Sequence, residues 1–277
     1  YALLAPHLGG SGYNNQAETS TYRGRQVLWA EQGTFGLALA AVDHSQRDAW
    51  GRASAGYVGS SDGWQDFHRH GRMSWHYAEA GPGEVALTAQ LPRAGTLALG
   101  MGSSREAAAT LALQSLAAGF APVWAAYCRG WQQWLDTIHW PRAPTPESLV
   151  MLRRSAAVIK CHEDHTYPGA FVASLSVPWG EASSSRGGYH LVWTRDMVKS
   201  ATALLATGSV ETARRALVYL ACSQQQDGGF AQNFWIDGTP YWKRIQLDQV
   251  ASPIILAWRL WKLGGLADFD PYPMVKA

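Results

Sequence analysis

The short segment that ends at Asp196 holds the residues of this chain that are best suited to chemistry. Arg195 and Asp196 stand side by side at the predicted start of a helix, and Tyr189 and Trp193 precede them. A carboxylate accepts hydrogen bonds from two hydroxyl groups at once, and a guanidinium donates through a rigid planar fork. Because two adjacent charges would each need a partner in an apolar core, the pair suits a polyhydroxylated ligand better.

The same two residues also have a purely structural explanation. Asp196 could cap the helix that follows, and Arg195 could form an ion pair with a neighbouring element. Spacing alone does not separate this explanation from ligand binding, so both stay open at this point.

Four further carboxylates lie in or beside the loops between predicted helices: Glu181, Asp227, Asp237 and Asp248. Asp227 and Asp237 each precede a glycine, and Asp in that position commonly bonds to the backbone of its own turn. We therefore interpret these two as turn residues. Glu181 has no comparable structural explanation.

The elements that must position these residues follow a β-rich first part. Residues 27–31 and 36–42 predict one hairpin, and residues 84–91 and 96–100 predict another. Strands joined in this way predict an antiparallel β-sandwich, which we place over residues 1–103.

The pattern changes at Ser104, which is the predicted N-cap of a helix. A second helical run, 123–135, carries four aromatic residues on one side, and we interpret that side as a packing face. These residues are Trp124, Tyr127, Trp131 and Trp134. Several prolines between Ile138 and Pro146 then break the helical pattern, so residues 104–144 are predicted to form a helical linker.

Residues 145–277 alternate between predicted helices and glycine-rich loops, a pattern typical of an α/α barrel. Thr145 is the predicted N-cap of the first helix, with Pro146 at its first position. The predicted helices cover residues 146–162, 196–207, 209–223 and 246–263. These helices are too few to close a barrel, the chain starts with Tyr1 rather than Met, and its last residues look like the start of another helix. We therefore expect a piece of a longer protein.

The composition argues against several classes of function. Hydrophobic residues make up 47% of the 277 residues, enough for a large core, and the formal net charge of +2 comes from 23 basic and 21 acidic residues. The absence of a long basic run argues against nucleic acid as a partner. No apolar stretch approaches the roughly 18 residues of a membrane span. The sequence also lacks a phosphate-binding glycine loop and a dinucleotide fingerprint, so we expect no cofactor.

Cysteines and histidines do not predict a metal site. Cys128, Cys161 and Cys222 are odd in number and far apart, so we expect three buried, unpaired side chains. His68 and His76 lie among aromatic residues without the spacing of metal ligands.

Three ordered motifs together resemble glycoside hydrolase family 15, the glucoamylases, and especially its bacterial members, which include the glucodextranases. The motifs occupy residues 189–196, 227–235 and 238–243, and Pro178-Trp179-Gly180 stands ahead of them. The resemblance is strong over about residues 145–277 and looser before them. It implies a galactose-mutarotase-like β-sandwich followed by a partial (α/α)6 barrel of the six-hairpin glycosidase type.

The resemblance implies roles for the first motif. Arg195 and Asp196 would hold the hydroxyl groups of a terminal glucose, Tyr189 would lie against its ring, and Trp193 would support the same pocket.

Later residues are similar to the same substrate-binding pattern. Trp242 matches an aromatic wall near the point of cleavage, and Lys243 and Asp248 lie in the same binding segment. The bacterial pattern implies a glutamate after Asp248, whereas Gln249 stands there in this chain. This departure concerns details of sugar binding rather than the class of enzyme.

The activity that the resemblance implies is inverting, exo-acting hydrolysis of α-glucosides, with release of β-glucose from the non-reducing ends of α-glucans. Inversion needs an acidic and a basic carboxyl group about 6.5–9.5 Å apart. In the family the acid lies in a Trp-Glu-Glu motif downstream of a helix that would start near Tyr272, and the base lies near the end of the barrel. Neither motif occurs here, so no catalytic residue is assigned and both are expected beyond residue 277.

We expect a monomer whose substrate is an α-glucan or an oligosaccharide. The sequence does not decide between α-1,4 and α-1,6 linkages. Export to an extracellular or periplasmic location is favoured. Some family members hold calcium, but no cluster of ligands here requires a metal.

Two other functions stay open. The missing carboxylates favour a non-catalytic carbohydrate-binding or scaffold module. An α/α-barrel terpene cyclase is the other alternative, because residues 226–230 superficially resemble its glutamine-rich repeat, although Asp268-Phe269-Asp270 is a sparse substitute for its acidic motif.

Overall fold

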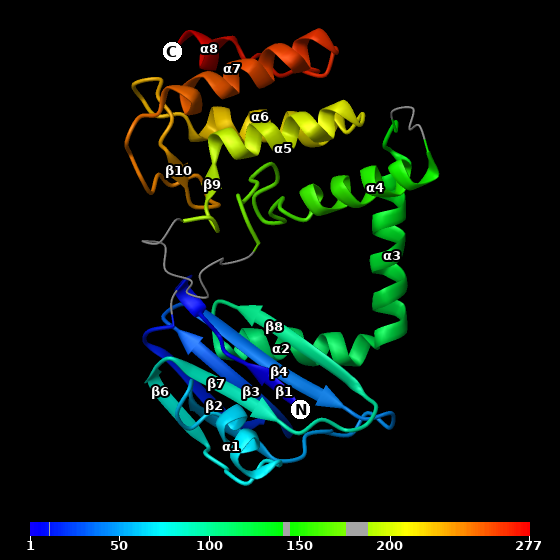
Figure 1. Cartoon of the computed structure of the whole chain (residues 1–277), viewed down its shortest axis with the longest axis vertical. Helices are drawn as coiled ribbons and strands as arrows, with labels where there is room; N and C mark the ends of the chain where they lie inside the picture. Colours follow the sequence, from blue (N-terminus) through cyan, green and yellow to red (C-terminus); the bar gives the residue numbers. More distant parts are fainter. Residues whose placement is uncertain (11, 141–144, 176–187) are drawn as a thin grey trace. The chain divides into compact units, whose positions relative to one another are not determined.

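The computed structural model describes residues 1–10, 12–140, 145–175 and 188–277 (Figure 1). The described chain folds into two compact units, with the boundary between Arg129 and Gly130. We describe each unit by itself.

The first unit contains two antiparallel sheets. The five-stranded sheet has the order β6-β2-β3-β4-β8, and the three-stranded sheet has the order β1-β7-β5. Their bounds are β1 Ala2–Leu4, β2 Asn15–Tyr22, β3 Arg25–Gln32, β4 Phe35–Val42, β5 Ala53–Tyr57, β6 Glu79–Gly83, β7 Val85–Ala89 and β8 Thr96–Gly102. This arrangement confirms the antiparallel β-rich first part and the hairpin of β3 and β4.

Alternating side chains give the five-stranded sheet two buried faces. Leu28 and Leu39 lie in the core shared with Leu87 of the small sheet. Trp29 and Ala40 lie on the opposite face, in a core with the helix α2, Arg105–Ala118. Burial of a side chain of the size of Leu28 or Leu39 stabilises the fold by about 1.5–3 kcal/mol.

Helix α2 begins where the sequence predicts. Ser104 is its N-cap, and the serine hydroxyl accepts a hydrogen bond from the backbone N–H of Ala107 at 3.1 Å. The helix approaches the sheet so closely that a Cβ atom on Gly100 would collide with the carbonyl oxygen of Ala108. Part of the stretch predicted as a linker therefore packs on the first unit's sheet.

The second predicted hairpin is wrong. β7 pairs with β1 and β5, whereas β8 pairs with β4 in the other sheet. β7 is buried along its whole length, and its Leu87 lies in the core between the sheets. The loop between the two strands thus crosses from one sheet to the other, and a proline-glycine loop between apolar runs is compatible with both connections.

A short helix, α1 Gly63–His70, was not predicted. Asp62 caps it by accepting hydrogen bonds from the backbone N–H groups of Trp64 and Gln65. A short 3-10 turn, η1, covers Leu8–Gly10.

The second unit is built from helices around a two-stranded ribbon. Its elements are α4 Pro146–Lys160, β9 Val192–Trp193, α5 Thr194–Ala206, α6 Val210–Ser223, β10 Asn233–Phe234, α7 Leu247–Lys262 and α8 Tyr272–Lys276. α4 to α7 confirm the four predicted helices, and the Thr145 hydroxyl accepts from the N–H of Ser148 at 3.2 Å as the predicted N-cap. Pro253 lies inside α7 and is buried.

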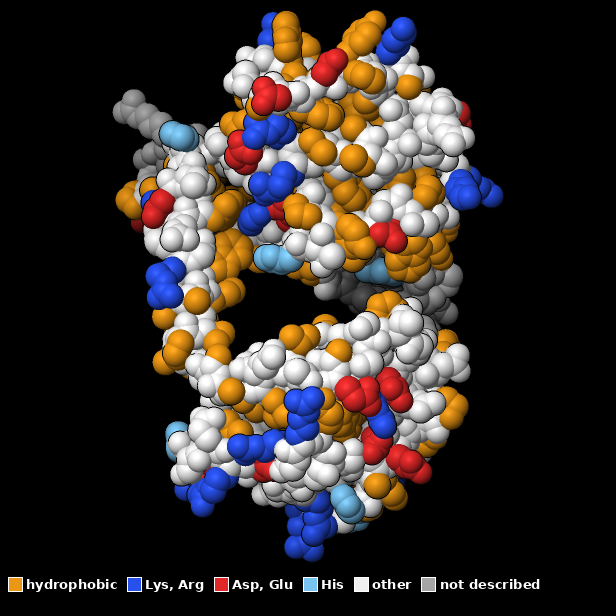
Figure 2. Space-filling view, turned by 180° about the vertical axis from the view of Figure 1, so that it is seen from behind, with side chains coloured by type: hydrophobic (Ala, Val, Ile, Leu, Met, Phe, Trp, Pro, Cys, Tyr) orange, Lys and Arg blue, Asp and Glu red, His pale blue; other side chains and the backbone are white. Residues whose placement is uncertain are grey.

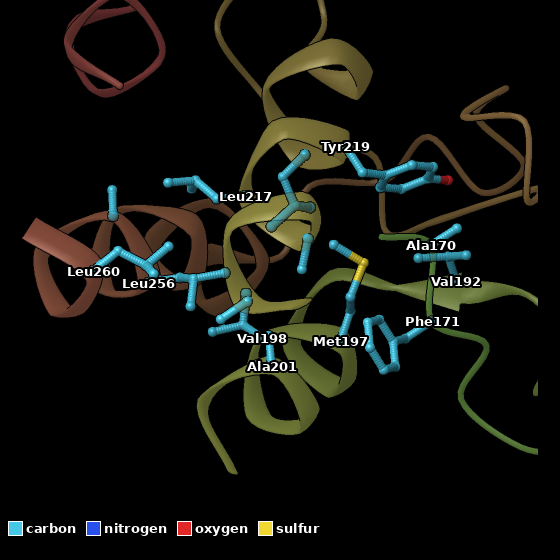
Figure 3. Close-up of a cluster of buried hydrophobic side chains, with 14 of the residues drawn as sticks. Ala170, Phe171, Val192, Met197, Val198, Ala201, Leu217, Tyr219, Leu256 and Leu260 are labelled. Atoms are coloured by element: carbon cyan, nitrogen blue, oxygen red, sulfur yellow. The ribbon is translucent and has the colours of Figure 1, made fainter. Parts of the chain in front are cut away.

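The core of this unit lies where α5, α6 and α7 meet (Figure 3). Met197 and Ala201 of α5, Leu217 of α6, and Leu256 and Leu260 of α7 are all buried in one cluster. This packing holds α5 and α7 together, and Arg195, Asp196 and Asp248 lie in the first turns of these two helices.

The cysteines were expected to be buried, and this prediction is wrong. Cys128, Cys161 and Cys222 are all exposed. Cys128 lies on α3, Phe120–Asp136, which buries none of its residues. Cys161 follows the last turn of α4, and Cys222 lies on the outer side of α6 beside the buried Ser223.

The aromatic side of α3 does not form the expected packing face along its length. Trp124 and Tyr127 are more than half exposed, and their rings stack on each other with centroids 5.6 Å apart. Trp134 alone of the four packs partly against the core of the second unit.

Charged side chains of both signs are interspersed on the faces of both units seen in Figure 2, in keeping with the small net charge. Within the described ranges, no single helix is long and apolar enough to cross a membrane, and only the bent pair of α2 and α3 passes that test jointly.

Candidate functional site

A two-stranded ribbon positions the candidate residues. β9 pairs antiparallel with β10, so that Trp193 lies opposite Asn233 and Val192 lies opposite Phe234. Val192 and Phe234 are fully buried and anchor the ribbon in the core. Because β9 leads directly into α5, the ribbon brings the first turn of that helix next to the loop that follows β10.

Three of the predicted aromatic residues and one neighbour form a continuous cluster on this ribbon. The ring of Trp193 stacks on that of Tyr189 with centroids 6.5 Å apart and an interplanar angle of 28°. Trp193 also meets Trp242 edge-on at 5.7 Å and 85°, and Trp242 contacts Tyr241 at 5.7 Å. The Trp193 indole N–H donates to the carbonyl of Gly188 at 3.0 Å.

Tyr189 is the most open ring of this cluster, with 42% of its surface exposed. An exposed aromatic ring backed by a second ring offers a flat apolar surface, which the apolar face of a sugar ring can cover. The cluster therefore has the form of a stacking platform.

Trp242 is held in place by a residue that sequence reasoning did not single out. The side-chain oxygen of the fully buried Asn233 accepts from the Trp242 backbone N–H at 2.9 Å. The carbonyl of Trp242 accepts from the Gln232 N–H at 2.8 Å. The motif at residues 227–235 contains both partners, but only the pairing in space assigns them this role.

Arg195 and Asp196 lie in the first turn of α5, and Arg195 has a partner. Its guanidinium forms an ion pair with the carboxylate of Asp248 in the first turn of α7, and both side chains are partly exposed. An ion pair as exposed as this stabilises the fold by only about 0–1 kcal/mol. This ion pair is the contact that the structural explanation expected for Arg195, and its partner, Asp248, is itself a predicted site residue.

Asp196 does not cap α5 as the structural explanation required. Trp193 is the N-cap residue, and it forms no side-chain cap hydrogen bond. Within residues 188–277 and the other described ranges, the partly buried carboxylate of Asp196 forms no hydrogen bond or ion pair. It retains its capacity to accept from a ligand, and the positive end of the helix dipole favours its charge by about 0.3–1 kcal/mol.

The other predicted residues are less closely integrated. Lys243 is exposed on the loop after Trp242, and it forms no ion pair with any described residue. Asp227 and Asp237 are confirmed as turn residues, because they accept from the N–H groups of Gly229 and Thr239 at 3.0 and 2.9 Å. Glu181 and the Pro178-Trp179-Gly180 motif lie outside the described residues.

His190, also missed by sequence reasoning, adds an uncharged neighbour. Burial lowers the pKa of its imidazole, and its ring lies 5.9 Å from that of Trp235. Its Nε2 atom is buried and has no partner among the described residues. A lowered pKa favours the neutral ring, which can act as donor or acceptor.

Carboxylates, imidazoles and thiols are the usual metal-binding side chains, and the described part of the chain contains all three kinds. None of its groups of three or more such side chains could hold a metal ion. The arrangement as a whole offers hydrogen-bonding charges beside an aromatic platform, which suits the binding of a neutral polyhydroxylated molecule.

Comparisons with known proteins match each unit of the chain. Residues 147–276 match the family described as glycosyl hydrolases family 15, and residues 1–136 match domain N of glucodextranase. The chain is 32% identical over 266 residues to a glucoamylase from Clostridium sp. (strain G0005), an alignment that covers 94% of this chain and 37% of that protein.

A solved structure shows the same fold. The crystal structure of a bacterial glucoamylase complexed with acarbose matches 96% of this chain and 40% of its own, with a TM-score of 0.81 and 32% identity. The chain thus spans well under half the length of both relatives.

Proposed function

The chain belongs to family 15 of the glycosyl hydrolases, and from this membership we propose that it supplies the sugar-binding part of an inverting, exo-acting α-glucoside hydrolase. The whole enzyme would release β-glucose from the non-reducing ends of α-glucans or oligosaccharides. Family membership sets the terpene-cyclase alternative aside.

The observation that carries this proposal is the position of the Asp196 carboxylate. It stands without a protein partner among the described residues, on the helix turn that follows Trp193, whose ring supports the exposed ring of Tyr189. A sugar lying on Tyr189 would present its hydroxyl groups to Asp196 and to Arg195. Hydrogen bonds between hydroxyl groups and charged side chains contribute about 1.5–3 kcal/mol each.

The remaining residues receive supporting roles in the proposal. Trp242 walls the pocket on the side of the cleaved bond, and Asp248 orients the Arg195 guanidinium through their ion pair. Lys243 follows Trp242 and reaches the outer part of the ligand.

The general acid and base are proposed to lie outside residues 1–277. Inverting hydrolysis requires one carboxylic acid to protonate the leaving oxygen and one carboxylate to activate water from the opposite face, about 6.5–9.5 Å apart. The residues described above bind and orient the sugar, and no proton-transfer step is assigned to them. A chain that spans 37% of the length of its glucoamylase relative is consistent with this division.

Two measurements test the proposal. The first titrates the chain with acarbose, maltose and isomaltose and follows tryptophan fluorescence, which should change as a sugar covers the aromatic cluster. The second replaces the matching segment of the clostridial glucoamylase with this chain and detects the anomer of glucose released from starch and dextran.

Release of β-glucose by the hybrid would show that this chain can serve as the sugar-binding part of an inverting hydrolase, and the ratio of the two substrates would give the linkage preference of the hybrid. Sugar binding by the chain together with an inert, folded hybrid would instead favour the non-catalytic carbohydrate-binding module. Absence of any binding by the chain would contradict the proposed role of Asp196.

A further inference from the structure

The N-cap residue of helix α5 forms no side-chain cap hydrogen bond. The first N–H groups of a helix have no partner inside it, and a serine, threonine or aspartate at the N-cap usually accepts from one of them. Here the N-cap is Trp193, whose indole can only donate. The N–H of Arg195, the second residue of the helix, therefore needs an acceptor from elsewhere.

Gln249 supplies that acceptor from a different helix. Its side-chain oxygen accepts from the backbone N–H of Arg195 at 2.7 Å, although the two residues are far apart in the sequence. Gln249 is fully buried in the first turn of α7. Because the Gln249 side chain is buried, water cannot easily replace it as the acceptor, so this bond costs more to break than an exposed one.

The nitrogen of the Gln249 amide forms a hydrogen bond as well. Its side-chain NH2 donates to the side-chain oxygen of Gln246, the N-cap residue of α7, at 3.2 Å. Since only the nitrogen end can donate, this bond orients the oxygen end toward Arg195. The amide thus joins the start of α7 to the start of α5 in one defined direction.

Two consecutive residues of α7 consequently hold the same turn of α5. Asp248 binds the guanidinium of Arg195, while Gln249 binds its backbone. The neighbouring residue in that turn is Asp196, so the position of its carboxylate depends on the turn that Gln249 fixes.

We propose that Gln249 is a positioning residue for sugar binding, which acts through the backbone of Arg195 and holds Arg195 and Asp196 in their binding geometry. The proposal rests on the proposed function of these two residues. A glutamate in this position could accept from Arg195, but when ionised it could not donate to Gln246, and it would add a negative charge beside Asp248. The amide fixes the turn without adding that charge.

The experiment compares acarbose binding by the unsubstituted chain with binding by Gln249→Met, which keeps the length of the side chain but removes its acceptor. The Met variant should bind about tenfold more weakly, the scale of one lost hydrogen bond. Gln226→Met, the same change at an exposed position of the same unit, is the matched control and should bind as the unsubstituted chain does.

A second readout separates positioning from a general loss of structure. Amide hydrogen exchange at Arg195, measured by NMR, should accelerate in Gln249→Met, while exchange in the core turn around Leu256 stays slow. Gln249→Glu keeps the acceptor, so the Arg195 N–H should stay protected, while the lost bond to Gln246 and the added charge beside Asp248 should make its acarbose binding weaker than that of the unsubstituted chain.

The outcomes are distinguishable. If the unsubstituted chain binds acarbose and Gln249→Met binds it equally tightly, this proposal is overturned while the proposed function stands. If the unsubstituted chain does not bind, the proposed function fails and this inference fails with it. If Gln249→Met does not fold, Gln249→Glu decides, because loss of Arg195 protection in that folded variant would contradict the role of the acceptor.

Discussion

The backbone N–H of Trp242 donates to the side-chain oxygen of Asn233, nine residues earlier, across 2.9 Å. Asn233→Ala leaves this N–H without its acceptor, so the free energy of unfolding should fall by about 1–3 kcal/mol. Urea unfolding measures this change. The near-ultraviolet circular dichroism of the Trp193 and Trp242 pair should also weaken, and an unchanged spectrum would mean that the loop does not depend on Asn233.

Glu163 should make the stability of the second unit depend on pH. Burial opposes ionisation of this carboxyl group, but hydrogen bonds from Arg215 and Lys160 outweigh burial and hold its pKa below the usual 4.5. A lowered folded-state pKa gives stability that is fully present above pH 4.5 and is lost as pH falls through the folded-state value. Urea midpoints between pH 7 and pH 3 should therefore decline.

Glu163→Gln tests this assignment. The variant should be destabilised by about 1–3 kcal/mol at pH 7, because two cations lose their buried anion, and its midpoint should vary less with pH. Glu211→Gln is the matched control, since Glu211 is exposed in its ion pair with Arg214. Its change should stay below about 1 kcal/mol, and equal effects of the two substitutions would refute the structural role of Glu163.

Asp196→Asn should impair the catalytically complete hybrid far more than Lys243→Ala. A charged acceptor to sugar hydroxyl groups strengthens as the ring flattens in the transition state, so kcat/KM should fall by about 10²–10³. Lys243 is exposed, and its replacement should have a smaller effect. Steady-state kinetics on maltose measures both, and full efficiency of the Asn variant would remove Asp196 from the site.

Gly100→Ala should destabilise the first unit, because the added methyl group collides with the carbonyl of Ala108 in α2. Overpacking of this kind costs about 1–3 kcal/mol. Gly130→Ala provides the opposite case, since it lies within α3 with open space around it, and it should be neutral or stabilising by up to about 1 kcal/mol. Thermal unfolding of the two variants distinguishes these effects.

The helix starts could be predicted from the sequence, because an N-cap residue bonds to backbone groups only a few residues away. Ser104 and Thr145 cap α2 and α4 as their residue types indicate, and both side-chain hydrogen bonds are present. The β7 and β8 connection could not be predicted in the same way. Both a hairpin and a crossing between sheets join two apolar strands through a turn, and only the pairing of β7 with β1 and β5, and of β8 with β4, distinguishes them.

In the candidate site, too, some residues can be recognised from the sequence and others only from the fold. Arg195 and Asp196 are recognisable from residue type and motif, but the partners that hold them are not. Gln249 and Asn233 are ordinary amides in the sequence, and their roles depend on the meeting of α5 with α7 and of β9 with β10. The exposure of the cysteines likewise depends on which side of each helix packs.

Pro253 removes one backbone hydrogen bond from α7. Because proline has no N–H, the carbonyl of Gln249 lacks a donor four residues ahead, and the carbonyl of Asp248 takes the Ser252 hydroxyl at 2.6 Å. The turn that carries Asp248 and Gln249 thus has one backbone hydrogen bond fewer to the turns that Leu256 and Leu260 anchor. The binding end of α7 is therefore held by its contacts with Arg195 of α5, through Asp248 and Gln249, as well as by the helix itself.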